Sequence, residues 1–515
     1  MPVARAMPLH TLPIHRSARL RASALTPAST RPSALAAAMQ LAQLAQLLDF
    51  RHGVLLVMRR HRRDAHPHSP APCDALHPVV TGDSRAGTDF ARQIPTIAPP
   101  VIDAVDYAAS DRKVRTMQQR STPRFTALGL ALSTAALAFG ATGASAADKV
   151  KVGFVSTLSG PSSALGVDIR DGFLLAVKMN GGKLGGLPAE VIVSDDQFKP
   201  DVAKQQFEKD IKRDKVDFMT GVVFSNIMLA ALPEALDSKT IYISPNAAPS
   251  SMAGKDCNPL FFAVAWPNDA YHEAAGQYAN TRNLKSVYLV APNYQAGKDS
   301  LAGFKRMFKG QVVGENYTKL GQLDYAAELA EIRAAKPQAV YIFLPGGMGI
   351  NFIKQYVGAG LGKDTTLLLP GFSADQDVIG PVGGAMAGLF NTAHWSPDFT
   401  NAANVKFVAE FEKEYKRVPT LYASQGYDTA LLIGAAVRDV KGKLDDQPAV
   451  LKALKAAKFD SVRGAFKFNT NNYPIQNYYV RTIGNDGKGG LINKSFNEPI
   501  LKNHGDAYVQ ACAMK

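Results

Sequence analysis

Two adjacent carboxylates, Asp195 and Asp196, are the residues whose types and spacing come nearest to acid and base chemistry. A pair of carboxylates can act in catalysis when one gives a proton and the other accepts one. These two follow a short apolar run, 189–194, and Asp is also favoured in turns, because its oxygens accept hydrogen bonds from nearby backbone N–H groups. We therefore expect Asp195 and Asp196 to cap the turn that follows.

Other catalytic motifs in the sequence are incomplete. The run Gly358-Ala-Gly360-Leu-Gly362-Lys363 has the wrong spacing for a phosphate-binding loop. The run Gly371-Phe372-Ser373-Ala374-Asp375 lacks the second glycine of a nucleophile elbow. After residue 146 the histidines are His272, His394 and His504, which are too dispersed to suggest a metal site. The sequence therefore favours a protein that is not an enzyme, and we expect no metal and no cofactor.

Short apolar runs alternate with helical patterns along the chain after residue 147. This alternation predicts βαβ units and parallel sheets covered by helices on both faces. The pattern restarts after Trp266-Pro267-Asn268-Asp269, which predicts two similar lobes. The expected strands are 150–157, 189–194, 216–223, 240–244, 286–291, one near Val312, 339–344 and 366–369. The expected helices include 166–180, 200–212, 226–236, 325–336 and 350–360.

The turns after these strands are rich in Gly, Ser, Asn or Pro. In parallel sheets, ligands bind beyond the carboxyl ends of the strands, where such turns meet. Any single turn is explained by ordinary turn and capping chemistry. Several turns on one edge together predict a binding site, and they are 158–166, 224–226, 245–250, 292–297, 345–349 and 371–377.

The segment 117–146 has the three parts of a secretory signal peptide. A basic head with Arg120 and Arg124 precedes an apolar run, 125–139, and the small residues Ala144-Ser145-Ala146 precede the predicted cleavage between Ala146 and Ala147. The apolar run is shorter than the roughly 20 residues of a membrane-spanning helix. The alternative is a buried helix inside a longer domain.

Residues 1–116 differ in composition from the rest of the chain. They contain fourteen Arg, one Lys and no Glu, whereas the chain from Ala147 onward has nine Arg and thirty-two Lys. We interpret 1–116 as a disordered extension translated from a misplaced start. The alternative is a basic tail that binds nucleic acid through Arg59-Arg60-His61-Arg62-Arg63.

The charge of the mature chain is close to balance. Of 58 basic and 44 acidic residues, 41 and 36 lie after residue 146. Such a balance gives no electrostatic support for nucleic-acid binding.

Two cysteines, Cys257 and Cys512, lie in the mature chain. Exported proteins with two thiols commonly pair them, so we predict a disulfide; two free thiols are the alternative. No cysteine follows Ala146 at the cleavage site, so we expect a free periplasmic protein and not a lipoprotein.

Several runs resemble the periplasmic binding proteins for leucine, isoleucine and valine. The resemblance extends from about Val150 to beyond Asp428, which is nearly all of the mature chain. The runs are Lys151-Val-Gly-Phe-Val-Ser-Thr-Leu158-Ser159-Gly160-Pro161, then Gly166 and Asp171-Gly172, Asp195-Asp196, Gly221-Val-Val-Phe224-Ser225-Asn226, Ile243-Ser244-Pro245-Asn246-Ala247-Ala248 and Gly426-Tyr427-Asp428-Thr429-Ala430.

The resemblance implies an α/β, two-lobed type I periplasmic binding protein fold, each lobe a parallel sheet flanked by helices, with a hinge between. We place the three crossings near Pro267, Pro397 and Ile475. The first lobe is then 147–267 with 397–475, and the second is 268–396 with 476–515. The expected partner is the membrane permease of an ABC importer, and the family default is a monomer.

The resemblance also implies the site. The carboxylate-holding turn falls on Ser225 and Asn226, at a helix N-terminus that favours an anion. The full set of expected ligand-binding residues is Ser159, Leu165, Phe224, Ser225, Asn226, Asn246, Ala247, Ala248, Trp266, Tyr294, Gly346, Gly347, Phe372 and Ser373.

One departure from the family pattern bears on the ligand. Where amino-acid binders carry a glutamate for the ligand ammonium, this chain has Phe372-Ser373, and a buried ammonium without an acidic partner is costly. Aromatic residues in the turns are suited to a planar ligand. We expect an aromatic carboxylate. The sequence also most resembles the branch of the family that binds benzoate-like and phenylpropanoid acids, which implies a ligand of the benzoate or phenylpropanoid type. The alternatives are a branched-chain or other amino acid held by Asp375 or Asp377, the sensor lobe of a signalling system, and an exported enzyme on the same fold.

Overall fold

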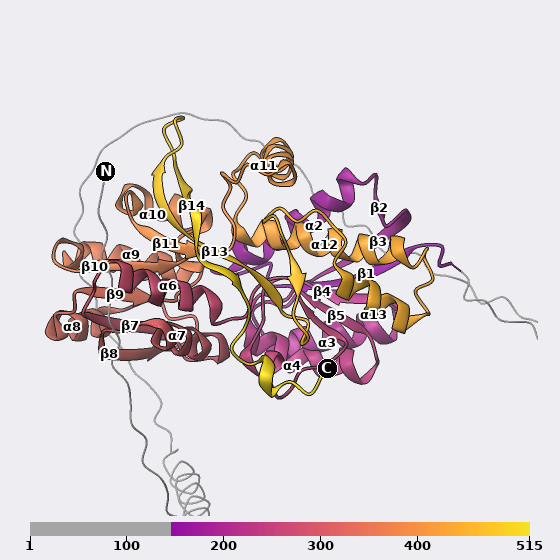
Figure 1. Ribbon diagram of the computed structural model, residues 1–515, viewed down its shortest axis with the longest axis horizontal. Helices are drawn as coiled ribbons and strands as arrows, with labels where there is room; N and C mark the ends of the chain where they lie inside the picture. The colour runs from indigo at the N-terminus through magenta and orange to yellow at the C-terminus, as the bar shows by residue number, and fades with distance from the viewer. Residues whose placement is uncertain (1–145, 515) are drawn as a thin grey trace, which may run out of the picture. The chain divides into compact units, whose positions relative to one another are not determined.

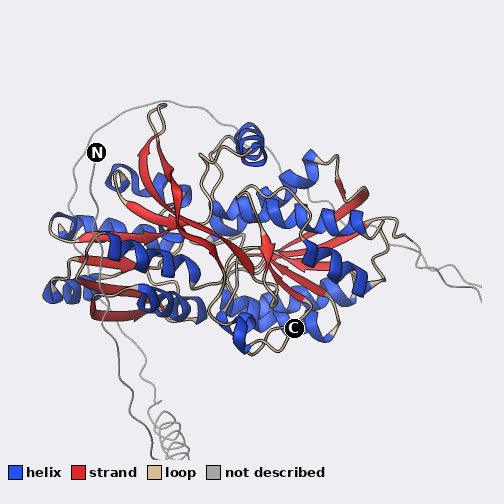
Figure 2. Cartoon of the chain, in the orientation of Figure 1, coloured by secondary structure: helices blue, strands red, loops and turns tan. Residues whose placement is uncertain are grey.

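The computed structural model describes residues 146–514, all within one compact unit of the chain, Leu130–Lys515. The upstream segment 1–116 and the predicted signal peptide, up to residue 145, lie outside the described residues. The described chain forms two sheets, each with its own helices (Figures 1 and 2). Here the first lobe means the six-stranded sheet with its helices, and the second lobe means the eight-stranded sheet with its helices.

The first lobe has the strand order β2-β3-β1-β4-β5-β6. Strands β1, β3, β4, β5 and β6 are parallel, and β2 pairs antiparallel with β3 at the edge. Its first ten elements are β1 (Val150–Ser156), α2 (Ser163–Met179), β2 (Lys183–Leu184), β3 (Leu187–Asp195), α3 (Pro200–Lys212), β4 (Phe218–Thr220), α4 (Ser225–Asp237), β5 (Ile241–Ser244), α5 (Ser250–Ala253) and β6 (Phe261–Ala263).

Three later helices complete the first lobe, and α12 packs along α2. Figure 1 shows α2 and α12 on one face of the sheet and α3 and α4 on the other. These helices are α11 (Ala402–Tyr415), α12 (Leu421–Asp439) and α13 (Gln447–Ala456). The short strand β12 (Lys467–Phe468), which follows them in the chain, pairs with β13 and belongs to the eight-stranded sheet.

The second lobe has the strand order β12-β13-β11-β10-β9-β7-β8, with β14 paired to β13. Strands β7 to β11 are parallel, as the sequence predicts, whereas β13 and β14 form a long antiparallel pair that the sequence analysis missed. Its elements are α6 (Ala270–Thr281), β7 (Ser286–Pro292), α7 (Gln295–Met307), β8 (Gln311–Thr318), α8 (Ala326–Ala335), β9 (Ala339–Ile342), α9 (Gly347–Gly358), η1 (Leu361–Lys363), β10 (Thr366–Pro370), η2 (Gly371–Ser373), α10 (Gln376–Val382), η3 (Gly383–Met386), β11 (Phe390–Ala393), β13 (Pro474–Asn485) and β14 (Leu491–His504).

The central strands are apolar because both faces of each sheet are covered. In β1, six of the seven residues are buried, including the five consecutive residues 152–156, and its partners β3 and β4 run parallel on either side. A strand with helices on both faces buries successive side chains, so it appears as a continuous apolar run and not as an alternating one. This is why β1, β5 and β9 could be located from the sequence.

The chain passes between the lobes three times: between β6 and α6, between β11 and α11, and along β13. One buried side chain joins all three crossings. Arg463 donates to the carbonyl of Val264 in the first crossing (2.7 Å) and to Gln476 in the third (2.8 Å). It also donates to Gln425 (2.8 Å), whose amide contacts His394 at the second crossing.

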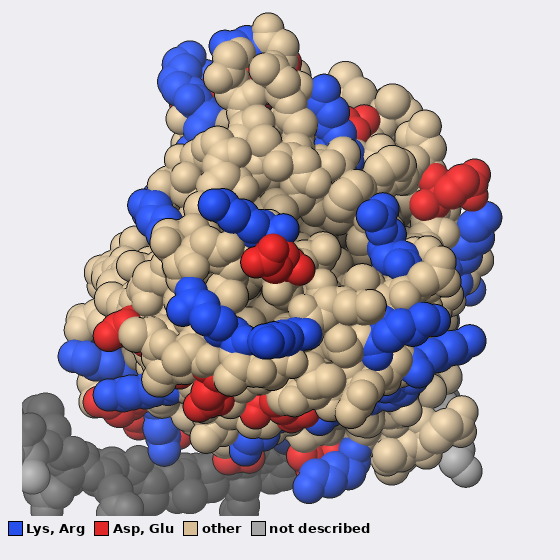
Figure 3. All heavy atoms as spheres, turned by 90° about the vertical axis from the view of Figure 1, so that its left-hand side faces the viewer, with Lys and Arg blue, Asp and Glu red and all other residues tan. Residues whose placement is uncertain are grey.

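Charged side chains of both signs are interspersed on the face of the second lobe shown in Figure 3. Within residues 146–514, no helix combines the length and the apolar character needed to cross a bilayer.

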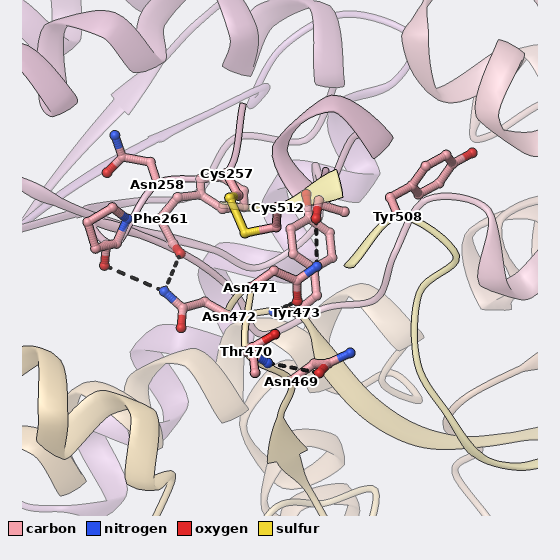
Figure 4. The surroundings of a disulfide bond; sticks show 12 residues. Cys257, Asn258, Phe261, Asn469, Thr470, Asn471, Asn472, Tyr473, Tyr508 and Cys512 are labelled. Atoms are coloured by element: carbon pink, nitrogen blue, oxygen red, sulfur yellow. Dashed lines mark hydrogen bonds between the residues drawn. A yellow bond between two sulfur atoms is a disulfide. The ribbon is translucent and has the colours of Figure 1, made fainter. Parts of the chain in front are cut away.

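The C-terminal segment after β14 returns to the first lobe. Cys512 is bonded to Cys257, with their Cα atoms 5.6 Å apart (Figure 4). Nearby, the Asn471 amide donates to the carbonyl of Ala253 (2.7 Å) and the Tyr473 hydroxyl to that of Pro249 (2.8 Å). The range 476–515, which the sequence analysis gives to the second lobe, thus ends in a segment covalently attached to the first.

Candidate ligand-binding site

A cavity of about 20 Å³ lies where the turns of the two lobes meet. This volume is room for about one water molecule. The aromatic side chains around it are buried, so a solute reaches the cavity only when the lobes separate. The cavity is lined by Leu165, Val223, Phe224, Ser225, Asn246, Ala247 and Tyr422 of the first lobe, by Trp266 and Asn268 of the first crossing, and by Tyr294, Ala296, Phe343, Pro345 and Phe372 of the second lobe.

The structure brings most of the predicted site residues together. The predicted residues that line the cavity are Leu165, Phe224, Ser225, Asn246, Ala247, Trp266, Tyr294 and Phe372. The others stand outside its wall. Asn226 is the second residue of α4, and its side-chain oxygen is buried without a partner among the described residues.

Ser159, Ala248 and Ser373 are predicted site residues that lie outside the cavity wall. Ser159 is exposed on the turn after β1. The N–H of Ala248 donates to the side chain of Asn268 (3.2 Å). The Ser373 hydroxyl is bonded to both the N–H (2.9 Å) and the carbonyl (3.1 Å) of Leu344. Ala248 and Ser373 therefore hold the backbone of the surrounding turns.

The N-terminus of α4 is the feature best suited to an anion. Its N-cap is Phe224, and no side chain caps the helix. The first N–H that bonds back into the helix is that of Met228, which donates to the carbonyl of Phe224 (2.9 Å). The preceding N–H groups, from Ser225 to Ile227, point out of the first turn, and with the helix dipole they favour a carboxylate.

A short chain of hydrogen bonds orients the Ser225 hydroxyl. The Asn268 amide nitrogen donates both to Ser225 Oγ (3.1 Å) and to Asp299 Oδ2 (3.1 Å). Because Ser225 Oγ accepts from Asn268, its own proton is available to donate elsewhere. Asp299 also accepts from the N–H (3.0 Å) and the hydroxyl (2.6 Å) of Ser250, and so it links the second lobe to the first.

Aromatic rings from both lobes form most of the cavity wall. Phe224 of the first lobe lies 6.3 Å from Tyr294 of the second, between ring centroids. Tyr294 and Phe343 are also 6.3 Å apart and nearly parallel, at 14°. Phe372 packs edge-on against Trp266 (4.8 Å) and Phe343 (5.4 Å). Such faces and edges suit a flat aromatic solute.

The two acids proposed as partners of an ammonium group differ in the structure. Asp375 is the N-cap of α10 and accepts from the N–H groups of Gln376 (2.9 Å) and Leu421 (3.0 Å), so its oxygens are used within the fold. Both oxygens of Asp377 are buried without a partner among the described residues. Burial raises the pKa of Asp377 well above its usual range. Neither acid lines the cavity.

The lobes touch at the lip of the cavity through two predicted glycines. Gly346 has a φ of +59°, and a Cβ there would lie 2.7 Å from Leu165 Cδ1. A Cβ on Gly347 would lie 2.9 Å from the carbonyl oxygen of Pro161. A side chain at either position would therefore meet the opposite lobe.

Asp195 and Asp196 cap the turn after β3, as the sequence predicts. Asp195 accepts from the N–H of Leu158 (2.9 Å), and Asp196 accepts from Thr157 Oγ1 (2.7 Å) and the N–H of Phe198 (2.8 Å). Burial raises the pKa of Asp196 to about 6. These hydrogen bonds show that the two adjacent carboxylates, Asp195 and Asp196, stabilise the turn.

Two of the three histidines, His272 and His394, are buried. His272 contacts the hydroxyl of Tyr341, and His394 contacts the hydroxyl of Tyr271. Burial lowers the pKa of His272 to about 3, so its ring is neutral near pH 7. In the described part of the chain, no three potential metal ligands come together.

Sequence reasoning missed several lining residues, notably Tyr422 and Asn268. The predicted site residues lie mainly in turns that follow strands. Tyr422 instead lies at the start of α12, which follows a loop and another helix, α11. Asn268 lies in the first crossing, which the sequence indicates only as the boundary between the two lobes. The signal available for Tyr422 was Thr420, whose hydroxyl accepts from the N–H of Ala423 (3.3 Å) as a helix N-cap should.

Two α/β lobes joined by three crossings, with a buried cavity between their facing turns, define a clamp-type binding protein. A family model described as Periplasmic binding protein matches residues 149–488, and the chain belongs to this family. It is therefore a solute-binding protein of an ABC transporter. Membership implies an extracytoplasmic location and a small-molecule ligand. The family is not normally enzymatic.

This chain aligns with known relatives over nearly the whole length of those relatives. Leu/Ile/Val-binding protein homolog 6 of Brucella melitensis is 27% identical over 391 residues, covering 74% of this chain and 99% of that protein. A solute-binding protein of an R. palustris ABC transporter, solved with benzoate, is 33% identical with a TM-score of 0.67, covering 71% of this chain and 99% of that one. A second, from Rhodopseudomonas palustris and solved with 3,4-dihydroxybenzoic acid, is 30% identical with a TM-score of 0.64, covering 69% and 99%.

Proposed function

We propose that the protein binds a small aromatic carboxylate of the benzoate or phenylpropanoid type and delivers it to the permease of an ABC importer. One observation carries this proposal. The cavity joins the uncapped N-terminus of α4 to a wall of aromatic rings, and none of its lining residues is charged. The helix terminus is suited to the carboxylate, and the rings are suited to the flat apolar part.

The ligands of the two R. palustris proteins, benzoate and 3,4-dihydroxybenzoic acid, belong to the same class. Both proteins are at least 30% identical to this chain and align along almost their entire length. Their ligands therefore support an aromatic acid.

A branched-chain amino acid is the second candidate. The Brucella melitensis relative is named as a homolog of a Leu/Ile/Val-binding protein. An amino acid carries an ammonium group that would need an acidic partner in a buried site. Asp377 is the acid that this candidate would use, because its two oxygens are buried without a partner within residues 146–514, although it does not line the cavity as the lobes stand in this structure.

The mechanism that follows is closure of the lobes on the ligand. A ligand held first at α4 gains contacts with Tyr294, Phe343 and Phe372 only when the second lobe approaches. That difference in affinity shifts the equilibrium from the open to the closed form. The closed form is the one that the permease recognises.

The remaining parts of the proposal concern the setting of the protein. We propose that it reaches the periplasm through cleavage between Ala146 and Ala147 and acts there as a monomer. The lobes are taken as 147–267 with 397–475 and 268–396 with 476–515. It binds no nucleic acid and catalyses no reaction.

A thermal-shift measurement on the purified protein tests the ligand class. A ligand that binds only the folded state stabilises it by about 2.7 kcal/mol at 100 times its Kd, which raises the Tm by several degrees. We expect this rise with benzoate-like or cinnamate-like acids and none with leucine or valine. The opposite result, a rise with leucine or valine alone, would replace the aromatic acid by an amino acid held at Asp377.

A further inference from the structure

The hydroxyl of Tyr422 is a polar group in the cavity for which the fold provides no partner. Tyr422 lines the cavity and is 1% exposed, and its Oη has no hydrogen bond among the described residues. Buried hydroxyl groups are normally paired, because an unpaired one loses its bonds to water without replacement. Several other buried tyrosines follow that rule: for example, the hydroxyls of Tyr356 and Tyr473 donate to the carbonyls of Thr365 and Pro249, both at 2.8 Å.

Tyr422 and Ser225 approach the cavity from opposite sides of the first sheet. Ser225 begins α4, which packs beside α3, and Tyr422 lies in the first turn of α12, which packs along α2 (Figure 1). The rings of Tyr294, Phe343 and Phe372 line the same cavity as Ser225 and Tyr422. Between ring centroids, Phe343 is 5.4 Å from Phe372, and Phe372 is 6.4 Å from Tyr422. A flat acid with its carboxylate at α4 therefore extends its ring toward Tyr422.

The state of the Tyr422 hydroxyl decides which groups it can receive. Burial raises the pKa of Tyr422 well above its usual range, so the hydroxyl keeps its proton. A neutral phenol both donates and accepts one hydrogen bond. Burial likewise raises the pKa of Asp377, which favours a neutral carboxyl nearby. A neutral group that donates and accepts, such as a ring hydroxyl, matches these neighbours better than a cation.

We infer that Tyr422 is a specificity-determining residue whose hydroxyl binds a ring hydroxyl on the ligand, on the side away from the carboxylate. The preferred ligand is then a hydroxylated aromatic acid and not an unsubstituted one. This inference rests on the proposed function, because it places the carboxylate at α4. It identifies Tyr422 as the group that distinguishes acids within the proposed class.

The test measures by calorimetry the Kd of benzoate, 3-hydroxybenzoate and 4-hydroxybenzoate with the purified protein and with Tyr422→Phe. We expect at least one hydroxybenzoate to bind the unaltered protein about tenfold more tightly than benzoate, and Tyr422→Phe to remove that preference while leaving benzoate affinity nearly unchanged. Because the variant loses an unpaired buried hydroxyl, its Tm without ligand should be equal or higher.

The matched control is Tyr242→Phe. Tyr242 in β5 is also fully buried with a hydroxyl that has no partner among the described residues, but it does not line the cavity. The control should leave the preference intact. Equal affinity of the unaltered protein for all three acids, or an equal loss for all three in Tyr422→Phe, would overturn the role of Tyr422 while the proposed function stands. Binding of none of the acids would overturn both.

Discussion

At the scale of single residues, the site depends on side chains that orient other side chains. Asn268 donates to Ser225 and to Asp299, and its own carbonyl accepts from the N–H of Ala248. Its amide thus holds the Ser225 hydroxyl with the proton directed away from Asn268. Asn268 acts as a positioning residue for the anion-binding turn.

We expect Ser225→Ala to weaken carboxylate binding about tenfold or more, because a hydrogen bond to a charged group is lost. Asn268→Ala should cost a similar factor, and the double variant little more than either alone, because both changes remove the same interaction. Calorimetric Kd values for the four proteins form the cycle. Losses that multiply in the double variant would show that Asn268 acts independently of Ser225.

At the scale of elements, the sequence predicted the parallel core well. The apolar runs of β1, β5, β7 and β9 and the helix 200–212 fall where the structure has them, because buried parallel strands are apolar throughout and α3 is amphipathic. The strand expected at 216–223 is shorter, Phe218–Thr220, because the backbone turns at Gly221, where φ is +109°.

The antiparallel pair β13 and β14 was missed for a physical reason. Its strands carry the polar residues Gln476, Arg481 and Asn493, which are buried and form hydrogen bonds within the fold. Because buried positions were expected to be apolar, these polar residues gave no sign in the sequence that they lie in a buried strand. The site, too, could be predicted only in part. The residues at strand ends were found, whereas Tyr422 depended on a helix–loop–helix segment whose path over α2 is a tertiary feature.

The lip of the cavity offers a test at this scale. Gly347→Ala introduces a Cβ 2.9 Å from the carbonyl oxygen of Pro161 in the opposite lobe, at a φ that other residues adopt readily. We expect it to hinder closure and weaken ligand binding several-fold, with the Tm of the ligand-free protein unchanged. Gly358→Ala at the other end of α9, where a Cβ meets nothing within 4 Å, is the control. Unchanged affinity in Gly347→Ala would mean that the lip does not limit closure.

At the scale of the whole molecule, the disulfide closes the chain on itself. Cys257 and Cys512 are 255 residues apart in sequence, so the bond restricts the unfolded chain strongly while joining the last segment to α5 and β6. The cavity residues are not part of this attachment.

We expect Cys257→Ser/Cys512→Ser to lower the free energy of unfolding by about 2–5 kcal/mol and the Tm by several degrees. Ligand affinity of the folded protein should stay the same. Denaturant titrations under oxidising and reducing conditions measure the effect. An identical Tm for the double variant and the unaltered protein would mean that the bond adds no stability.

Arg463 limits how the two lobes can move. Three separate peptide segments could twist or slide past one another as well as bend, which would give the lobes several independent motions. Because one guanidinium bonds directly to the first and third segments and, through Gln425, to the second, those segments stay in register near it. We infer that these bonds favour one motion of the lobes, a rotation that a single angle describes, over sliding of the segments past one another.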